Sequence, residues 1–359
     1  MLEKQNWKSK LAHSFKNIKD LYLYLGWPLS DNINDVASKY PIFIPLSLAT
    51  KIKEEGPEGI LAKEFLPSHL ESDRDFNSFG LIDPIGDKSY LKAPQLIHRY
   101  YSRALFTPTS ICPVHCRYCF RKNELSATED IFQNDFEKTL QYLKDHAEIS
   151  EVIFTGGDPL TLSNEKIEFY LNSFEKIKSI KHIRFHTRYP IILPERIDTG
   201  FIEMMSRFSE IFKTMSIAIH SNHLNEFDES NSNVIKLLAT TNVQLLGQTV
   251  LIRGINDSEN ALIELFEKFI ELKIRPYYLH HPDRVHGAMH FYLPIARGRL
   301  IYQGLRQKLP GWAIPQYVID IPEGHGKTPA YNPEDYQYSG KLISKDGRIV
   351  DLKEPDLFV

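Results

Sequence analysis

The spacing of hydrophobic residues changes repeatedly along the chain after residue 103. Short stretches rich in β-branched and aromatic residues alternate with longer stretches in which apolar residues recur every three or four positions, and this pattern predicts alternating strands and helices. The predicted strands lie at 104–107, 151–155, 182–187, 215–219, 243–250 and 274–280. The predicted helices lie near 136–143, 167–174, 197–208, 234–238, 262–272 and 297–309.

Six successive β–α units imply a parallel sheet, because each return to the next strand needs a crossover connection. Six units are too few for a closed eight-unit barrel. We therefore expect an α/β fold with an open, partial (βα)6 barrel of the TIM type. In such barrels the reactive groups lie at the carboxyl ends of the strands, so the loops that follow the strands are the first places to seek a functional site.

The first 95 residues have a different pattern. Apolar residues recur at helical spacing from Trp7 to Leu23, and further short helices are predicted at 46–54 and 57–65. Residues 1–95 are therefore predicted to form an N-terminal helical appendage whose role is packing or a dimer contact.

After residue 310 the pattern becomes irregular. A short strand is predicted at 317–320, a glycine-rich turn at 322–329, and a hairpin at 341–351 that turns at Asp346 and Gly347. The chain is thus divided into an N-terminal helical region at 1–95, a partial barrel at 96–309 and a C-terminal segment at 310–359.

Composition and charge exclude several classes of protein. The formal net charge is −3, which gives no basic surface for a nucleic acid. No apolar run of about 18 residues is present, so no membrane span is expected. The first residues also lack the apolar core of a signal peptide. We therefore expect a cytoplasmic protein in a reducing compartment that binds neither nucleic acid nor membrane.

The only three cysteines of the 359 residues, Cys112, Cys116 and Cys119, fall within one loop. Three thiolates can hold three irons of a 4Fe–4S cluster and leave the fourth iron open, whereas electron-transfer clusters normally have four protein ligands. Three alternatives compete with this interpretation. The cysteines could form a disulfide with one free thiol, a zinc site completed by His115 or another histidine, or ordinary buried thiols.

The CxxxCxxC spacing, with Tyr118 before the last cysteine, resembles that of the radical S-adenosylmethionine enzymes. This resemblance implies that the open iron binds S-adenosylmethionine, whose reductive cleavage gives a 5′-deoxyadenosyl radical. It also implies cofactor contacts from residues after the strands, namely Gly156, Gly157, Asp158 and His220. By themselves the two glycines are equally compatible with a tight turn between strand and helix.

Lys327 lies in the glycine-rich turn. By itself it is best explained as an exposed turn lysine, although lysine is also the residue that binds pyridoxal phosphate covalently. The segment 317–329, however, resembles the pyridoxal-lysine segment of the lysine 2,3-aminomutases. Other segments match that family in order, at 98–103, 186–190, 220–223, 247–257 and 282–291. The resemblance extends from about residue 80 to residue 335 and includes relatives that supply β-lysine for elongation factor P.

The resemblance implies a role for each of several charged residues. Arg99, Arg103, Arg188 and Gln248 match positions that bind the pyridoxal phosphate group, which needs several positive or donor groups. Arg121 matches the residue that binds the substrate carboxylate. Asp283 and Asp320 match the carboxylates that bind the terminal ammonium of lysine, and two anions offset the desolvation of a buried ammonium. Any single arginine could instead form a surface salt bridge.

The family reaction is the conversion of L-lysine to β-lysine by an intramolecular aminotransferase. The 5′-deoxyadenosyl radical removes hydrogen from C3, and the amino group migrates from C2 to C3. The implied cofactors are a 4Fe–4S cluster, S-adenosylmethionine and pyridoxal phosphate. A reductant such as flavodoxin or ferredoxin and a homo-oligomeric state are also expected.

Three other functions stay open at this point. The same reaction could be dedicated to elongation factor P, the substrate could be another amino acid such as ornithine or glutamate, or the chain could be a non-catalytic iron–sulfur or zinc module. Two departures from the long-chain family members bear on this choice. Glu323 and His325 stand where those enzymes have glycine, and no cysteine is left over for an intersubunit zinc.

Overall fold

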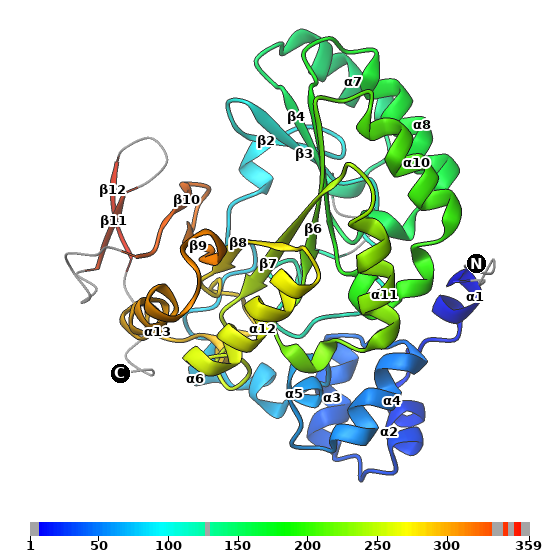
Figure 1. Ribbon diagram of the computed structural model, residues 1–359. Coiled ribbons are helices and arrows are strands. Elements are labelled where there is room, and N and C mark those ends of the chain that lie inside the picture. The colour runs from blue at the N-terminus through cyan, green and yellow to red at the C-terminus, as the bar shows by residue number, and fades with distance from the viewer. Residues whose placement is uncertain (1–6, 126–129, 332–339, 344–347, 353–359) are drawn as a thin grey trace.

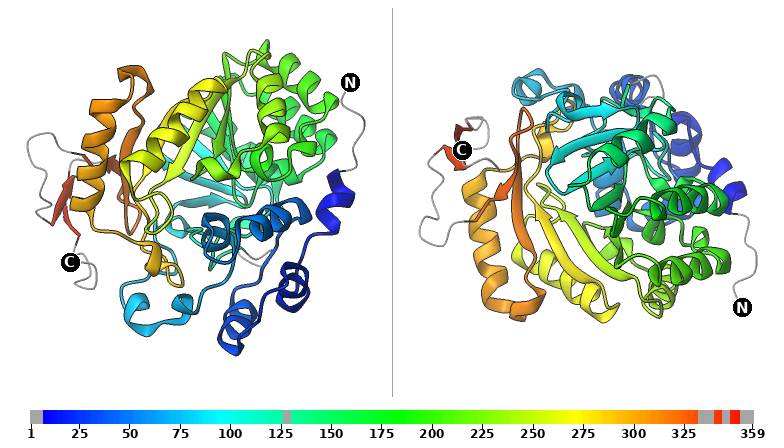
Figure 2. Two further views of the ribbon diagram at one scale, coloured as in Figure 1. Left: turned by 60° about the horizontal axis from the view of Figure 1, so that its bottom comes forward. Right: turned by 90° about the horizontal axis from the view of Figure 1, so that it is seen from above.

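The computed structural model describes residues 7–125, 130–331, 340–343 and 348–352. Ten strands form one mixed sheet in the order β1 to β10, and the seven strands from β3 to β9 are parallel (Figure 1). The strands of this sheet are β1 (Leu91–Ala93), β2 (Leu96–Tyr100), β3 (Arg103–Phe106), β4 (Glu151–Phe154), β5 (His182–Thr187), β6 (Thr214–His220), β7 (Gln244–Val250), β8 (Arg275–His280), β9 (Gln316–Ile321) and β10 (Gly326–Pro329). Seen from above in Figure 2, the strands curve into an open barrel with helices outside. The predicted α/β partial barrel is therefore confirmed.

The helices between the parallel strands cover the outer face of the sheet. They are α7 (Phe136–Asp145), α8 (Asn164–Glu175), α9 (Tyr189–Ile192), α10 (Thr199–Ser209), α11 (Glu229–Leu238), α12 (Glu259–Glu271) and α13 (Ile295–Lys308). Several begin at a side chain that caps the free backbone N–H groups, as Ser163, Asp198 and Ser258 do for α8, α10 and α12. Their apolar faces pack on the sheet, which accounts for the helical spacing seen in the sequence.

Aromatic side chains fill much of the core between the sheet and the helices. The ring centroids of Phe106 on β3 and Phe154 on β4 lie 5.4 Å apart, and both rings contact Phe174 of α8. All three side chains are fully buried. This rigid core positions the carboxyl ends of the strands, where the cysteine loop follows β3.

The sheet extends beyond the six predicted units. The segment at 317–320 was predicted as a short strand in a separate C-terminal part, but β9 pairs in parallel with β8 and makes a seventh parallel strand. β10, which carries Lys327, pairs antiparallel with β9. At the other edge, β1 and β2 add two antiparallel strands. The division into three regions stays a prediction, and the sheet draws strands from all three.

Short helices make up the N-terminal region and lie beneath the barrel (Figures 1 and 2). They are α1 (Trp7–Ala12), α2 (Ile18–Leu25), α3 (Asp31–Lys39), α4 (Leu46–Glu55), α5 (Ile60–Phe65) and α6 (Arg74–Asn77). The backbone N–H groups of His115 and Arg117 donate to the carbonyls of Phe43 and Glu64, so this region packs directly on the cysteine loop.

The remaining elements are short. The 3₁₀ helices are η1 (His69–Ser72), η2 (Lys88–Tyr90), η3 (Asp130–Phe132), η4 (Pro159–Thr161), η5 (Pro194–Arg196), η6 (Leu224–Glu226), η7 (Met289–Phe291) and η8 (Gly311–Ala313). The predicted C-terminal hairpin is present as β11 (Lys341–Ile343) and β12 (Ile349–Asp351), but its turn at Asp346 and Gly347 lies outside the described residues. Within the part of the chain that the structure describes, no helix is long and apolar enough to cross a membrane.

Candidate active site

A cavity of about 270 Å³ opens at the carboxyl ends of the parallel strands. Every site residue that the sequence singled out lines this one cavity. These residues are Cys112, Cys116, Cys119, Gly156, Gly157, Asp158, His220, Arg99, Arg103, Arg188, Gln248, Lys327, Arg121, Asp283 and Asp320. Residues from the loop after β3, from the ends of most parallel strands and from β10 thus converge, although they span more than two hundred positions.

The three cysteines are free thiols, and with their neighbours they form one group of lining residues, called the cysteine end below. A single zinc ion with Zn–S bonds of about 2.3 Å would hold its thiolates about 3.8 Å apart. Among the described residues, at least one pair of these three sulfur atoms is more than 4.8 Å apart. His115 is not among the residues that line the cavity, and its Nδ1 forms a hydrogen bond with the Pro41 carbonyl at 2.9 Å. The arrangement thus fits a cluster of several irons better than zinc completed by His115.

Burial opposes ionisation of all three thiols and raises the pKa of Cys119 to about 12. A metal cluster would displace these protons, since the thiolate is the form that ligates. A positive group already faces one sulfur, because Arg188 Nη1 lies 3.2 Å from Cys116 Sγ. The donor set and its surroundings therefore suit an iron–sulfur cluster.

Arg188 is held at this cysteine end rather than left free for another ligand. Its Nη2 donates to Glu64 Oε1 at 2.6 Å and also to Glu226, while Nη1 donates to Tyr118. Burial and the nearby Glu226 raise the pKa of Glu64 to about 7. No sequence pattern marks Glu64 or Glu226, because each is a lone acidic residue in a helix of ordinary pattern.

The Gly156–Gly157–Asp158 segment packs against the cysteine loop. A Cβ atom on Gly157 would lie 2.5 Å from the Ile111 carbonyl, and one on Gly156 would lie 2.8 Å from the Thr109 carbonyl. Only glycine allows this close backbone approach. The Asp158 carboxylate accepts from Thr187 Oγ1 at 2.8 Å, from Arg188 N at 2.7 Å and from Leu160 N at 3.0 Å. Burial nevertheless raises the pKa of Asp158 to about 6.

Histidines line the cavity between its two ends. His220 Nε2 lies 2.7 Å from the Tyr118 hydroxyl, and the two rings are stacked. Burial lowers the pKa of His186, His220 and His280, so all three are neutral near pH 7. The Nε2 atoms of His186 and His280 are buried without a hydrogen-bond partner among the described residues. The sequence analysis did not single out His280.

Lys327 belongs to a second group of lining residues, called the lysine end below. On β10 it pairs across from Asp320 of β9, and its Nζ donates to Asp320 Oδ2 at 2.5 Å. Arg99 Nη1 donates to Asp320 Oδ1 at 3.2 Å. Burial opposes the ionisation of Asp320, but Lys327 and Arg99 outweigh it and lower its pKa. Burial and the charge of Asp320 raise the pKa of Asp283 to about 8.

The turn that precedes Lys327 is strained at one residue. Glu323 has φ 61°, in the left-handed region that favours glycine, and Gly324 follows with φ 79°. This turn also touches the loop from the N-terminal region, because a Cβ atom on Gly86 would lie 2.3 Å from Gly324 N. The sequence departure at Glu323 therefore falls where glycine would relieve backbone strain.

Asp87 links the two arginines nearest the substrate end. Its fully buried carboxylate accepts from Arg99, and Arg121 Nη2 donates to its Oδ2 at 2.5 Å. Among the described residues, Arg121 Nε and Nη1 have no hydrogen-bond partner, and the carboxylate of Glu124 is 3.8 Å from Nη1. A buried guanidinium with free donors is suited to bind an anion such as a carboxylate. The sequence analysis did not identify Asp87.

Arg103 and Gln248 complete the wall. The guanidinium of Arg103 lies 3.9 Å from the ring centroid of Tyr100, and the Tyr100 hydroxyl accepts from the backbone N–H of Lys327 at 2.7 Å. Gln248 extends from the end of β7. Apolar residues fill the spaces between the polar groups, among them Ile97, Leu105, Val114, Val250 and Phe291.

Comparison with known proteins agrees with this geometry. The sequence profile of the Radical SAM superfamily matches residues 106–266, which include the three cysteines and His220. The chain therefore contains a radical SAM domain. The putative L-lysine 2,3-aminomutase of Aquifex aeolicus is 33% identical over 330 residues, which cover 90% of this chain and 88% of that protein.

Further curated proteins are similar over comparable lengths. L-lysine 2,3-aminomutase of Haemophilus influenzae is 31% identical over 91% of this chain and 96% of its own length. That of Clostridium subterminale is 28% identical over 98% and 84%. The solved structure of Streptococcus suis SuiB covers 62% of this chain and 50% of its own at 18% identity, and its TM-score of 0.45 is too low to bear on the fold.

The chain belongs to the lysine 2,3-aminomutase family of radical SAM enzymes, which are isomerases. Membership of the superfamily implies a 4Fe–4S cluster and S-adenosylmethionine as cofactors.

Proposed function

We propose that this protein is a pyridoxal phosphate-dependent 2,3-aminomutase that converts L-lysine to β-lysine. One observation carries the proposal: a single cavity has three free cysteines at one end and Lys327, beside two carboxylates, at the other. A cluster that generates a radical and a lysine amine that holds an aldehyde cofactor would together, in one cavity, suit the migration of an amino group.

The cysteine end would hold the cluster and S-adenosylmethionine, which when bound supply the radical that removes a hydrogen atom. Cys112, Cys116 and Cys119 would ligate three irons, and Arg188 would remain hydrogen-bonded to Cys116. The Gly156–Gly157–Asp158 segment and His220 lie beside the cysteines and would hold the nucleoside cofactor. Their backbone and ring groups are fixed before binding, which lowers the cost of orienting the cofactor.

The lysine end would hold pyridoxal phosphate, which when bound supplies an aldehyde that takes up an amino group. Lys327 is the residue proposed to attach it. Arg99 and Arg103 lie near Lys327, through the contacts of Arg99 with Asp320 and of Arg103 with Tyr100. Together with Gln248, which lines the same cavity, they would donate to the phosphate group. The family resemblance also implies a phosphate-binding role for Arg188. Its contacts with Glu64, Glu226 and Cys116 instead favour a role at the cysteine end.

The substrate would lie between the two ends. Arg121 lines the cavity and has two donors without a hydrogen-bond partner among the described residues, so it would bind the α-carboxylate. Asp87 fixes the orientation of this guanidinium. Asp283 and Asp320 would bind the terminal ammonium, whose positive charge would stabilise the ionised form of Asp283. The apolar wall would keep water from the reacting carbons.

Absorbance and iron content test this proposal. Reconstituted anaerobically, the protein is expected to hold about four irons per chain and to release 5′-deoxyadenosine when reduced with S-adenosylmethionine. The absorbance of bound pyridoxal phosphate is expected in wild type and absent in Lys327→Ala, with Lys341→Ala on exposed β11 as the control. Wild-type protein that never binds pyridoxal phosphate would contradict the proposal.

The other functions lead to different outcomes in the same assay. Supplying lysine, ornithine and glutamate in parallel identifies the substrate, and the carboxylates of Asp283 and Asp320 favour a cationic side chain over that of glutamate. A protein dedicated to elongation factor P would give the same product and differ only in its destination. A non-catalytic module would release no 5′-deoxyadenosine. Flavodoxin or ferredoxin as reductant and a homo-oligomeric state stay predictions.

A further inference from the structure

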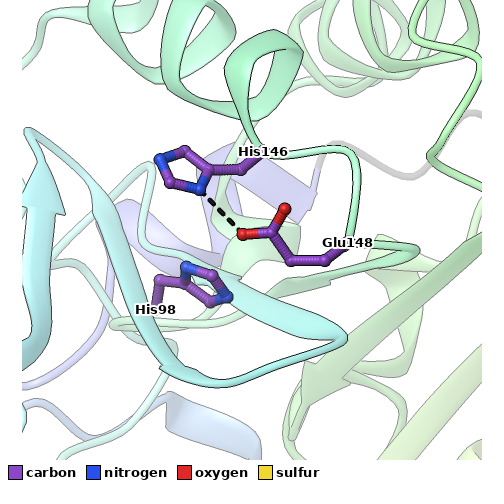
Figure 3. Close-up of side chains that lie close together, drawn as sticks. All are labelled: His98, His146 and Glu148. Carbon is purple, nitrogen blue, oxygen red and sulfur yellow. Dashed lines mark hydrogen bonds and ion pairs between the residues drawn. The ribbon is translucent and has the colours of Figure 1, made fainter.

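Two histidines and a glutamate come together outside the cavity (Figure 3). His98 lies on β2, His146 is the C-cap of α7, and Glu148 lies in the loop before β4. One ligand atom from each residue lies within 4.8 Å of the other two, which holds for no other set of three such residues in the described ranges. None of the three lines the cavity, so this cluster is separate from the radical SAM site.

The hydrogen bonds of His98 leave one ring nitrogen as an acceptor. Nε2 lies 3.3 Å from the carbonyl oxygen of Tyr101, which can only accept, so Nε2 carries the proton. Nδ1 therefore carries no proton, and its lone pair accepts a hydrogen bond from the Tyr142 hydroxyl at 3.0 Å. A metal-bound histidine almost always donates its second N–H to a carbonyl, carboxylate or water, and His98 has this arrangement.

His146 and Glu148 are also held in place for a ligand. Nδ1 of His146 lies 2.8 Å from Glu148 Oε1, and the Tyr142 ring stacks on His146 with centroids 3.9 Å apart. The side chains of His146 and Glu148 are 37% and 27% exposed, so an ion from solvent can reach them.

We propose that His98, His146 and Glu148 bind one divalent transition-metal ion and that zinc fits them best. Two imidazole nitrogens and one carboxylate oxygen match the ligands that zinc takes, and water would fill the fourth position. Calcium and magnesium are disfavoured because they prefer oxygen ligands throughout. The ion would replace the proton that His146 shares with Glu148 and would displace the Tyr142 hydroxyl from His98.

The site would tie one strand of the sheet to a neighbouring loop. His98 precedes Arg99 on β2, and successive side chains of a strand point to opposite faces. Arg99 accordingly faces the cavity while His98 faces α7. A metal ion bound behind Arg99 would fix β2 against the loop between α7 and β4. This role is structural and does not depend on the proposed reaction.

Zinc titration of the full chain tests the site. The protein carries its reconstituted cluster, so its cysteines are occupied, and free zinc is followed with a competing chelator. We expect one zinc per chain in wild type and binding weakened about tenfold or more in His146→Gln and in Glu148→Gln. The matched control is His182→Gln, whose histidine bonds Thr214 and lies outside the cluster, and it should bind zinc like wild type.

Two further readouts separate this site from other binding. The difference spectrum on adding cobalt in place of zinc should show no new thiolate charge-transfer bands, and a variant with all three cysteines changed to serine should keep the zinc site. Zinc should also raise the melting temperature of wild type but not that of Glu148→Gln. The proposal fails if wild type takes up no zinc, if both variants bind it equally well, or if binding is lost with the cysteines. In the first two cases His146 and Glu148 form only an ion pair.

Discussion

Asp87 accepts hydrogen bonds from Arg99 and Arg121, so one buried carboxylate orients two guanidinium groups of the cavity wall. Without it, two buried positive charges would face each other with no anion between them. No sequence pattern marks Asp87, because a single acidic residue in a loop is typical of exposed turns. The cysteine loop differs in this respect, since the spacing of Cys112, Cys116 and Cys119 indicates a metal cluster even before the fold is known.

Asp87→Asn keeps the shape of the side chain and removes its charge. We expect kcat/KM for lysine to fall about 100-fold, because Arg121 is then less firmly positioned toward the carboxylate. Iron content after reconstitution should stay near that of wild type, since Asp87 does not touch the cysteines. Asp75→Asn, on the exposed side of α6, is the control. Unchanged kinetics in Asp87→Asn would show that Arg121 binds the substrate carboxylate without help from the charge of Asp87.

Buried carboxylates also make stability depend on pH. Burial raises the pKa of Glu64 and of Glu124 to about 7, so the folded state binds their protons more tightly than the unfolded state. The contribution of these two carboxyl groups to the free energy of unfolding should therefore fall as pH rises from about 4.5 to about 7. Buried histidines such as His280 and His281, whose pKa values burial lowers to about 3, contribute a rise over the lower part of this range. The pKa values of Asp320 and Glu71 are lowered, so the stability that these two carboxylates contribute is lost only at lower pH.

Glu124→Gln should gain stability relative to wild type between pH 5 and pH 7.5, by up to a few kcal/mol, because a neutral side chain loses no proton in that window. Urea unfolding of the cofactor-free protein at pH 5 and pH 7.5 measures the slope for wild type and variant. Glu137→Gln, an exposed change on α7, should leave the slope as it is. If Glu124→Gln has the wild-type slope, Glu124 does not titrate in this range.

At the scale of elements, the sequence predicted the six β–α units because each strand and helix has its own hydrophobic period. It did not predict that β9 would join the sheet in parallel, since strand pairing is decided by packing between distant segments. The same limit explains why β1, β2 and β10 were not assigned to the sheet. The position of Lys327 opposite Asp320 follows from the β9–β10 register, which only the structure supplies.

The turn before Lys327 offers a prediction at this scale. Glu323→Gly should raise the free energy of unfolding by up to about 1 kcal/mol, because glycine adopts φ 61° without steric cost and the larger freedom of the unfolded chain offsets part of the gain. Glu323→Ala keeps the strain and should show no gain. Urea unfolding compares the two variants, and equal stabilities would mean that Glu323 is not strained.

For the whole molecule, the N-terminal region is part of the site rather than an addition to it. Glu71, fully buried, accepts from Arg117 Nε at 2.9 Å and from Lys122 Nζ at 2.5 Å, and Arg117 lies between Cys116 and Tyr118 in the cysteine loop. Glu64 reaches the same end through Arg188. The sequence analysis expected packing or a dimer contact here, because helical spacing shows which residues are buried but not against what.

Glu71→Gln should therefore weaken both stability and cluster binding. Breaking a buried ion pair costs about 3–5 kcal/mol, since Arg117 and Lys122 keep their charges without a partner. Iron content after reconstitution should fall together with the urea midpoint, whereas Glu58→Gln in an exposed loop should change neither. A destabilised variant that still takes up the full complement of iron would show that the N-terminal region does not hold the cysteine loop in place.

The central claim is that the cysteines and Lys327 act on one substrate in one cavity. Anaerobic incubation of the reconstituted, reduced protein with S-adenosylmethionine, pyridoxal phosphate and lysine, followed by identification of the products, tests it most directly. We expect β-lysine from wild type, none from Lys327→Ala, and none when pyridoxal phosphate is omitted. A wild-type protein that cleaves S-adenosylmethionine but forms no β-lysine would contradict it.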